Sequence, residues 1–354
     1  MAKKADSQER APVSLYRAYR PSNFEEVRGQ EHVVAVLKAA VKDQKVAHAY
    51  LFAGGRGTGK TSMARILARA LGTDEQDIYE MDAASNRGID EMRELREGVS
   101  TLPFASRYKF YIIDEAHALT KDAWGALLKT LEEPPSHVIF VLATTELDRV
   151  PETIISRCQV FNFKKPSLEI LKKLVRDVAA QEVPGNKSFG PNIAEAIALM
   201  GDGSFRDTLG ILQKVLTVES KITEEDLIRL VGAPSGVIER DFIKSIADGK
   251  LDVAVALVEE LVSKTDTDLK IFTFFVINKI RMVLLLRFSP TMEKQLTDEN
   301  SEELINFLKD IAKTSKCINS NLLSELLRAY MDMGKSPLPQ IPLELALYRA
   351  LGEV

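Results

Sequence analysis

The stretch that decides the fold is HAYLFAGGRGTGKTSMARILARAL, residues 48–71. Its apolar start, AYLFAG (49–54), predicts a buried strand. A glycine-rich turn follows, and the apolar residues of TSMARILARAL (61–71) then recur at helical spacing. A glycine loop between a strand and the first turn of a helix is typical of phosphate-binding sites.

The loop GGRGTGKT (54–61) satisfies the P-loop pattern G-x-x-x-x-G-K-[ST]. Glycines let the backbone turn its N–H groups toward phosphate oxygens. We expect Lys60 to reach the β- and γ-phosphates and the Thr61 hydroxyl to ligate Mg²⁺. A chance glycine loop is the alternative, which the flanking strand and helix disfavour. The predicted phosphate-binding residues are Gly54, Gly55, Arg56, Gly57, Thr58, Gly59, Lys60, Thr61 and Ser62.

An acidic pair lies in FYIIDEAH (110–117), directly after four apolar residues that predict a strand. We expect Asp114 to hold Mg²⁺ through water and Glu115 to orient and polarise the attacking water. A glutamate here favours hydrolysis over binding alone. The alternative is a solvated pair of carboxylates at the end of a strand.

Two further candidates lie in VLATTELDRVPETIISRCQVF (141–161). Thr144 ends a predicted strand, so its hydroxyl is a candidate sensor of the γ-phosphate; the alternative is an ordinary β-branched strand residue. Arg157 is a candidate for stabilising transition-state charge, in cis or across a subunit boundary. Its alternative is a surface ion pair.

The order of predicted elements indicates an α/β domain followed by helices. Short apolar strands alternate with helices up to about residue 166, which predicts a parallel sheet covered on both faces. From 167 the pattern is helical, and it changes again near APSGV (233–237). The predicted parts are a disordered tail (1–13), an α/β domain (14–166), a small helical unit (167–233) and a larger helical unit (234–354).

Composition indicates a globular protein of a reducing compartment. The chain has 354 residues, a formal charge of −4 and two cysteines, Cys158 and Cys317, whose spacing fits no metal motif. The polar N-terminus has no secretory character, and no apolar run reaches transmembrane length. We therefore expect a cytoplasmic protein with no membrane segment.

Several strings together resemble the gamma/tau subunit of the bacterial DNA polymerase III clamp loader, a AAA+ ATPase family. They are YRAYRPSNFEEVRGQEHV, HAYLFAGGRGTGKTS, DAASNRGIDEMRELRE, YIIDEAHALTKDAWGALLKTLEEPP, FVLATTELDRVPETIISRCQVF, GDGSFRDTLGILQ and LPQIPLELALYRAL. The resemblance spans residues 14–354. It implies a AAA+ P-loop domain, a helical lid at 167–233 and an all-α collar at 234–354 that forms oligomeric contacts.

The resemblance also implies roles for individual residues. Arg157, in SRC, matches an arginine finger that acts in trans, and Arg206, in GSFRD, matches a lid arginine that touches the nucleotide in cis. Arg87 and Lys129 match the DNA-facing inner chamber, although each is also explained as a solvated charge. Four residues match the stretch that lines the adenine pocket: Tyr19, Arg20, Pro21 and Val27.

The implied function is an ATP- and Mg²⁺-dependent motor subunit that opens the sliding clamp and loads it onto primer–template DNA. Its implied partners are clamp-loader subunits of the delta and delta-prime type. The family carries the holoenzyme's classification as DNA-directed DNA polymerase, a nucleotidyltransferase. A four-cysteine zinc module of most members is missing before DAASN, so we expect no zinc, and the length resembles the gamma-type form.

Two other functions remain as alternatives. DEAH also occurs in helicases, but a helicase of that type needs a second α/β domain, and the C-terminal third predicts helices. An AAA+ helicase of the branch-migration type would lack the helical collar. A non-hydrolysing scaffold subunit is the other alternative, and it predicts a damaged P-loop or a missing acidic pair. Both motifs are intact here.

Overall fold

The computed structural model describes residues 14–86, 88–183, 191–217, 232, 234–265, 267–299 and 302–352. The predicted tail (1–13), Arg87 and nearly all of the predicted helix TEEDLIRLVG (223–232) lie outside these residues. The chain divides into two compact units, Met1–Glu182 with Gly201–Lys214 and Val183–Met200 with Val215–Val354. Each unit is described by itself, and the three-part division made from the sequence stays a prediction.

The first unit contains a five-stranded sheet in the order β2-β3-β4-β1-β5, and all neighbouring strands are parallel. The prediction of a parallel α/β sheet is therefore confirmed. The P-loop, the acidic pair and Thr144 lie at the carboxyl ends of three adjacent strands, β1, β3 and β4. Because these strands are parallel, the three groups lie at the same edge of the sheet. The strands are β1 (Ala49–Gly54), β2 (Ile78–Asp82), β3 (Lys109–Asp114), β4 (Val138–Thr144) and β5 (Gln159–Phe163).

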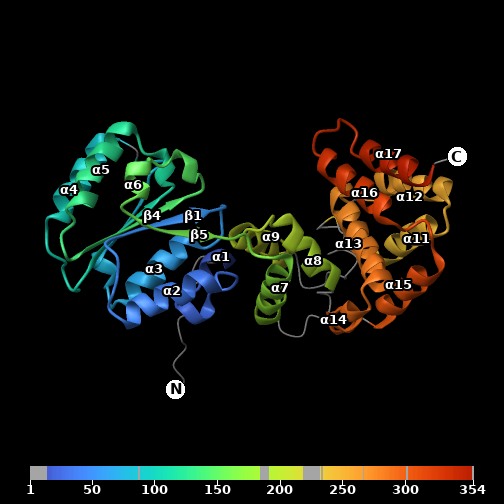
Figure 1. Ribbon diagram of the computed structural model, residues 1–354, viewed down its shortest axis with the longest axis horizontal. Coiled ribbons are helices and arrows are strands. Elements are labelled where there is room, and N and C mark those ends of the chain that lie inside the picture. Colours follow the sequence, from blue (N-terminus) through green and yellow to red (C-terminus); the bar gives the residue numbers. More distant parts are fainter. Residues whose placement is uncertain are drawn as a thin grey trace, which may run out of the picture. The chain divides into compact units, whose positions relative to one another are not determined.

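Helices cover both faces of this sheet (Figure 1). In β1, Tyr50 and Phe52 pack in the core with α2 and α3, whereas Ala49 and Leu51 pack in the core with α4, α5 and α6. Burial on both faces explains why β1 and β4 are apolar throughout instead of alternating. The covering helices are α2 (Glu31–Lys42), α3 (Lys60–Ala70), α4 (Ile89–Val99), α5 (Lys121–Glu132) and α6 (Glu152–Ile155).

Three helices outside the sheet approach the P-loop. They are α1 (Leu15–Ala18), α7 (Leu168–Glu182) and α9 (Phe205–Leu216), of which α9 belongs to the first unit up to Lys214. The backbone N–H of Phe205 donates to the Gly57 carbonyl at 3.0 Å. Gly57 has φ +68°, and a Cβ there would collide with the Ser204 hydroxyl. The start of α9 therefore lies directly against the phosphate loop.

Short 3-10 turns punctuate the chain. The acidic pair leads into one of them, and another begins three positions after Thr144. They are η1 (Phe24–Glu26), η2 (Glu75–Asp77), η3 (Ala116–Ala118), η4 (Leu147–Arg149) and η5 (Pro290–Met292).

The second unit is helical, as the sequence predicts, and the 20-residue α13 contributes buried residues between Leu269 and Val283 to its core. The Arg287 guanidinium, near the end of α13, donates to the carbonyls of Ala312, Ser315 and Ile318 and so fixes the end of α15. The helices are α8 (Pro191–Met200), α11 (Gly236–Ala247), α12 (Leu251–Lys264), α13 (Leu269–Phe288), α14 (Glu293–Glu299), α15 (Glu302–Thr314), α16 (Ser320–Asp332) and α17 (Gln340–Leu351).

The three prolines of KSPLPQIPLE (335–344) favour a loop between two helices, but α17 already begins at Gln340 within this segment. Pro342 is accommodated because the first turn of a helix needs no N–H from that position. Across the described helices, none combines the length and the apolar character needed to cross a membrane.

Candidate functional site

The P-loop holds its lysine in a buried position at the start of α3. Lys60 is 6% exposed, and its ammonium group donates to the carbonyls of Gly54 and Gly55 at 2.8 and 2.9 Å. Burial lowers the pKa of Lys60, while the nearby carboxylates of Glu115 and Asp114 act in the opposite direction. The ammonium group thus sits over the loop without a direct carboxylate bond in the part of the chain that is described, as a phosphate-binding lysine requires.

The two predicted Mg²⁺ ligands lie in direct contact. The Thr61 hydroxyl donates to Oδ2 of Asp114 at 2.8 Å, and the backbone N–H of Glu115 donates to Oδ1 of Asp114 at 3.0 Å. Hydroxyl and carboxylate oxygens are the hard ligands that Mg²⁺ prefers, and it commonly keeps several waters besides them. The pair therefore fits a Mg²⁺ site of the P-loop kind.

A cavity of about 1200 Å³ opens beside these groups within the first unit. Its walls come from the segment around 16–30, the P-loop, the acidic pair, α7 and the start of α9. Arg28 is paired with Asp177 and Arg65 with Glu80, at 2.8 and 2.6 Å. Among the described residues, five other lining cations form no ion pair with a carboxylate: Arg17, Arg20, Arg56, Lys60 and Arg206. An excess of unpaired cations suits a polyanionic ligand such as a triphosphate.

All four residues predicted for the adenine pocket line this cavity: Tyr19, Arg20, Pro21 and Val27. Arg20 donates from Nε to the Ser62 hydroxyl at 2.8 Å, which ties this segment to the first turn of α3. The Tyr19 hydroxyl donates to Glu182 at 2.6 Å, and this bond raises the pKa of Tyr19 to about 12. Tyr19 is therefore anchored as a neutral donor.

Sequence reasoning missed an apolar and aromatic part of the wall. Tyr16 lies near the predicted stretch, and its ring is 5.8 Å from the Arg206 guanidinium carbon, a cation–π distance. Leu174 and Val178 of α7 also line the cavity. Their spacing marks them as buried in the sequence, but it gives no sign of which ligand or helix they face.

The cavity beside the P-loop is also lined by residues 56–62 of the predicted phosphate loop and by Arg206. Gly54 and Gly55 instead lie at its base, where their carbonyls bind Lys60. A Cβ on Gly54 would collide with the Phe163 carbonyl of the paired strand β5, so glycine is needed there for close approach of the two strands.

Three predicted residues lie away from the cavity lining. Thr144 is fully buried, and its hydroxyl is 3.1 Å from Nδ1 of His117. Arg157 lies near the surface, where it donates to Glu132 and to the Thr153 carbonyl, each at 2.7 Å. Lys129 is exposed on α5. Their roles toward γ-phosphate, a neighbouring subunit and DNA stay predictions.

Among the described residues, no group of three or more His, Cys, Asp or Glu side chains is arranged to hold a metal ion. Cys158 is a free cysteine, and burial raises the pKa of its thiol to about 12. The thiol is therefore a poor nucleophile at neutral pH.

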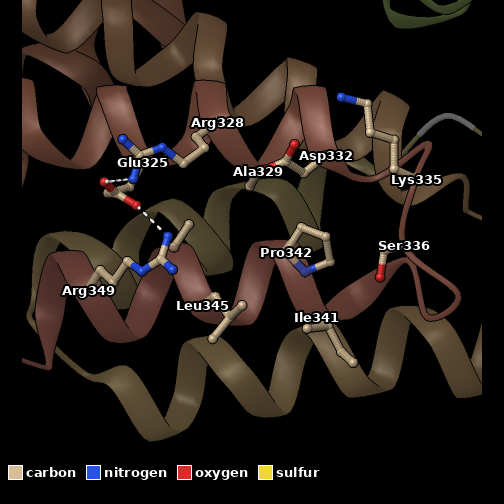
Figure 2. A pocket seen from close by; sticks show the side chains of 11 residues that line it. Glu325, Arg328, Ala329, Asp332, Lys335, Ser336, Ile341, Pro342, Leu345 and Arg349 are labelled. Atoms are coloured by element: carbon tan, nitrogen blue, oxygen red, sulfur yellow. Dashed lines mark hydrogen bonds and ion pairs between the residues drawn. The ribbon is translucent and has the colours of Figure 1, made fainter.

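A second cavity, of about 300 Å³, lies between α16 and α17 in the other unit. Figure 2 shows the Glu325 carboxylate between the guanidinium groups of Arg328 and Arg349. The two ion pairs measure 3.2 and 3.3 Å. None of the residues predicted from the sequence lies in this cavity.

The strand order, the P-loop after β1 and the acidic pair after β3 define the first unit as a P-loop nucleoside triphosphatase fold of the AAA+ class. Among solved structures, the chain resembles the Holliday junction branch migration motor RuvB of Thermotoga maritima, with a TM-score of 0.50 and 22% identity. That match covers 70% of this chain and 87% of RuvB, and it supports the fold alone.

Sequence relatives narrow the family. The chain is 38% identical over 318 residues to DNA polymerase III subunit tau of Bacillus subtilis, covering 82% of this chain and 56% of that protein. It is 32% identical to the gamma/tau subunit of Mycobacterium tuberculosis, and the match covers 96% of this chain and 62% of that protein. It is 29% identical to the gamma subunit of Buchnera aphidicola, covering 96% and 99%.

A family model described as DNA polymerase III, delta subunit, matches residues 29–88 and 77–167. The identity to the tau and gamma/tau relatives shows that the chain belongs to the gamma/tau family of DNA polymerase III subunits. It spans somewhat more than half the length of the Bacillus and Mycobacterium relatives.

Proposed function

We propose that this chain is an ATP-driven motor subunit of a clamp loader, which opens a sliding clamp and places it on primed DNA. The observation that carries the proposal is the contact between Thr61 and Asp114 beside the buried ammonium group of Lys60. It supports a site prepared for a nucleoside triphosphate with Mg²⁺. Membership of the gamma/tau family supports the proposal that the energy of ATP hydrolysis is used for clamp loading.

In the proposed mechanism, ATP enters the cavity with its base toward Tyr19 and Val27 and its phosphates toward the P-loop amides. Thr61 and Asp114 would hold Mg²⁺, which would supply positive charge beside the phosphates. Glu115 takes a proton from water as the water oxygen attacks the γ-phosphorus and the bond to the β-phosphate oxygen breaks. Lys60 and Arg206 stabilise the negative charge that develops on the phosphates.

We propose that ATP binding and hydrolysis change the position of the first turn of α9. Phe205 binds the carbonyl of Gly57, and Arg206 lines the same cavity, so phosphates and α9 share one small region of structure. We propose that ATP draws Arg206 inward, that hydrolysis releases it, and that this change loosens the grip of an assembled ring on clamp and DNA.

The remaining roles are proposals that rest on family membership. Arg157 completes the site of a neighbouring subunit, and Lys129 and Arg87 contact the DNA backbone inside the ring. The C-terminal helices form the collar, and delta- and delta-prime-type subunits complete the assembly. DNA synthesis belongs to the polymerase holoenzyme in which this motor works, and we keep the cytoplasm as its proposed location.

A non-hydrolysing scaffold is a weaker proposal because Lys60, Asp114 and Glu115 are all present and gathered at one edge of the sheet. A helicase with two α/β domains is weaker still, since the described residues of the second unit are helical.

The test is steady-state ATP turnover with and without clamp, partner subunits and primed DNA. We expect stimulation of the wild-type chain and loss of turnover in Lys60→Ala. Arg240→Ala, which removes an exposed ion pair to Glu303 on the second unit, serves as the control and should keep full activity. Undiminished turnover in Lys60→Ala, or no stimulation by clamp and DNA, would contradict the proposal.

A further inference from the structure

His117 of η3 is the one histidine of the FYIIDEAH segment, and the proposed mechanism gives it no role. Its side chain is 13% exposed and contacts the carboxyl ends of both β3 and β4. Nδ1 lies 3.1 Å from the Thr144 hydroxyl and 3.5 Å from the Glu115 carboxylate, and Nε2 lies 3.3 Å from the Glu146 carboxylate. The ring thus touches both proposed hydrolytic groups, Glu115 and Thr144.

These contacts determine where the Thr144 hydroxyl points. Thr144 Oγ1 already accepts the backbone N–H of Glu146 at 3.0 Å. With the ring hydrogen on Nε2, which faces the Glu146 carboxylate, Nδ1 accepts the Thr144 hydroxyl hydrogen. The Thr144 hydroxyl is thus held through its hydrogen by His117 and through its oxygen by the backbone N–H of Glu146.

Glu115 is held by the same group of side chains. Its carboxylate accepts the Thr145 hydroxyl at 3.1 Å and lies beside His117. Its backbone has φ +48°, an uncommon conformation for a residue with a side chain. Packing and hydrogen bonds must keep it there, and the Thr145 hydroxyl and the His117 ring both link Glu115 to the end of β4.

We propose that His117 is a positioning residue for ATP hydrolysis, which orients the Thr144 hydroxyl through Nδ1 and packs beside the Glu115 carboxylate. This inference rests on the proposed function. His117 does not touch nucleotide; it contacts Thr144, the predicted γ-phosphate sensor, and Glu115, the proposed base. Small errors in such geometry reduce the rate of the chemical step more than they reduce binding.

The proposal also connects the site to the surface. Nε2 of His117 contacts Glu146, which is paired with the exposed Arg149 of η4 at 2.9 Å. A contact made at Arg149 would thereby reach Glu115 through two side chains. The loop and helix that follow lead to Arg157, so the same segment carries the candidate finger.

Matched variants separate the two ring nitrogens. The asparagine side chain places a polar atom near the position of Nδ1, and glutamine places one near Nε2. We expect kcat for ATP in His117→Ala to fall about tenfold, with KM and nucleotide affinity changed less than about twofold. His117→Asn should recover most of kcat, and His117→Gln should remain near the alanine value.

A double-mutant cycle tests whether His117 acts through Thr144. If it does, adding His117→Ala to Thr144→Val should lower kcat by much less than it lowers kcat in the wild-type chain. The melting temperature and the affinity for a fluorescent ATP analogue are measured for each variant, so that unfolding is recognised. The asparagine and glutamine variants keep the test informative where alanine fails to fold.

Unchanged kcat in His117→Ala, equal kcat in the asparagine and glutamine variants, or fully additive losses with Thr144→Val would overturn the inference. These outcomes are distinct from failure of the proposed function. If the wild-type chain, supplied with clamp, partners and DNA, hydrolyses no ATP, the proposed function fails. If the wild type hydrolyses ATP and Lys60→Ala does not, only the role of His117 is in question.

Discussion

Two cavities in the described part of the chain hold their cations in opposite ways. Between α16 and α17, Arg328 and Arg349 share the Glu325 carboxylate, as the close-up in Figure 2 shows. In the cavity beside the P-loop, Lys60 binds only backbone carbonyls, and Arg206 faces an aromatic ring. In the first cavity the cations form ion pairs with a carboxylate of the protein. In the second cavity the cations remain available for ion pairing with a bound anion.

This difference distinguishes a binding site from a structural contact more clearly than cavity size does. A buried cation without a carboxylate destabilises the folded protein until a ligand pairs with it. An ion pair whose cation is mostly exposed, such as that of Arg328 with the buried Glu325, adds little, and its removal affects stability alone. The comparison therefore predicts which substitutions change function and which change only folding.

The largest expected effect comes from Glu115→Gln, which keeps the size and hydrogen-bonding shape of the side chain but removes the base. We expect kcat for ATP to fall at least about 100-fold, as loss of a general base does, while ATP affinity stays within about threefold. Single-turnover hydrolysis and ATP binding on the same sample measure the two effects. Equal losses of binding and turnover would indicate that Glu115 supports nucleotide binding instead.

Gly57→Ala is expected to weaken ATP binding about tenfold, because φ +68° and the Ser204 side chain leave no room for a Cβ. The start of α9, and with it Arg206, should move away from the P-loop. Calorimetric titration with ATP measures the loss. The matched control is Gly210→Ala in α9, where nothing lies within 4 Å of the new Cβ, and it should bind normally. Normal affinity in Gly57→Ala would show that α9 does not couple to the nucleotide.

Thermal unfolding compares the two cavities directly. Lys60→Met removes a buried charge, so the nucleotide-free protein should unfold at the same temperature as the wild type or higher, while the ATP-induced shift disappears. Glu325→Ala should lower the free energy of unfolding by about 1 kcal/mol, since its partners are more than half exposed, and should leave the ATP-induced shift intact. The opposite pattern would refute the distinction between the cavities.

The smallest effect is a pH dependence. Because burial lowers the pKa of Lys60 in the folded protein, the charged form is disfavoured there, and the loss of stability is complete below the folded-state pKa. Stability should recover as pH rises from that pKa toward the ordinary lysine value. The difference in unfolding free energy between Lys60→Met and wild type should therefore shrink toward pH 10. A constant difference would show that the ammonium group is not desolvated.

The sequence predicts the centre of the nucleotide site better than its walls. Lys60, Thr61, Asp114 and Glu115 follow local patterns in which a strand, a loop and a charge are adjacent in the chain. Leu174 and Val178 belong to a helix that lies more than 100 positions from the P-loop lysine and about 60 from the acidic pair. Their periodicity shows that they are buried but does not say against what.

Thr144 illustrates another limit of sequence reasoning. Its place at the end of β4 is predicted correctly, and the register beside β1 follows from the parallel sheet. The direction of its hydroxyl depends on His117, which comes from another strand end, and no local pattern contains that pair. Arg157 is similar, since its bond to Glu132 joins segments 25 residues apart.

The most direct test of the account is a crystal structure with a non-hydrolysable ATP analogue and Mg²⁺. We predict phosphates on the amides of 57–61, the ammonium group of Lys60 against the β- and γ-phosphates, and Mg²⁺ beside Thr61 and Asp114. An empty cavity at saturating nucleotide, or nucleotide bound elsewhere in the chain, would contradict the claim that these unpaired cations form a triphosphate site.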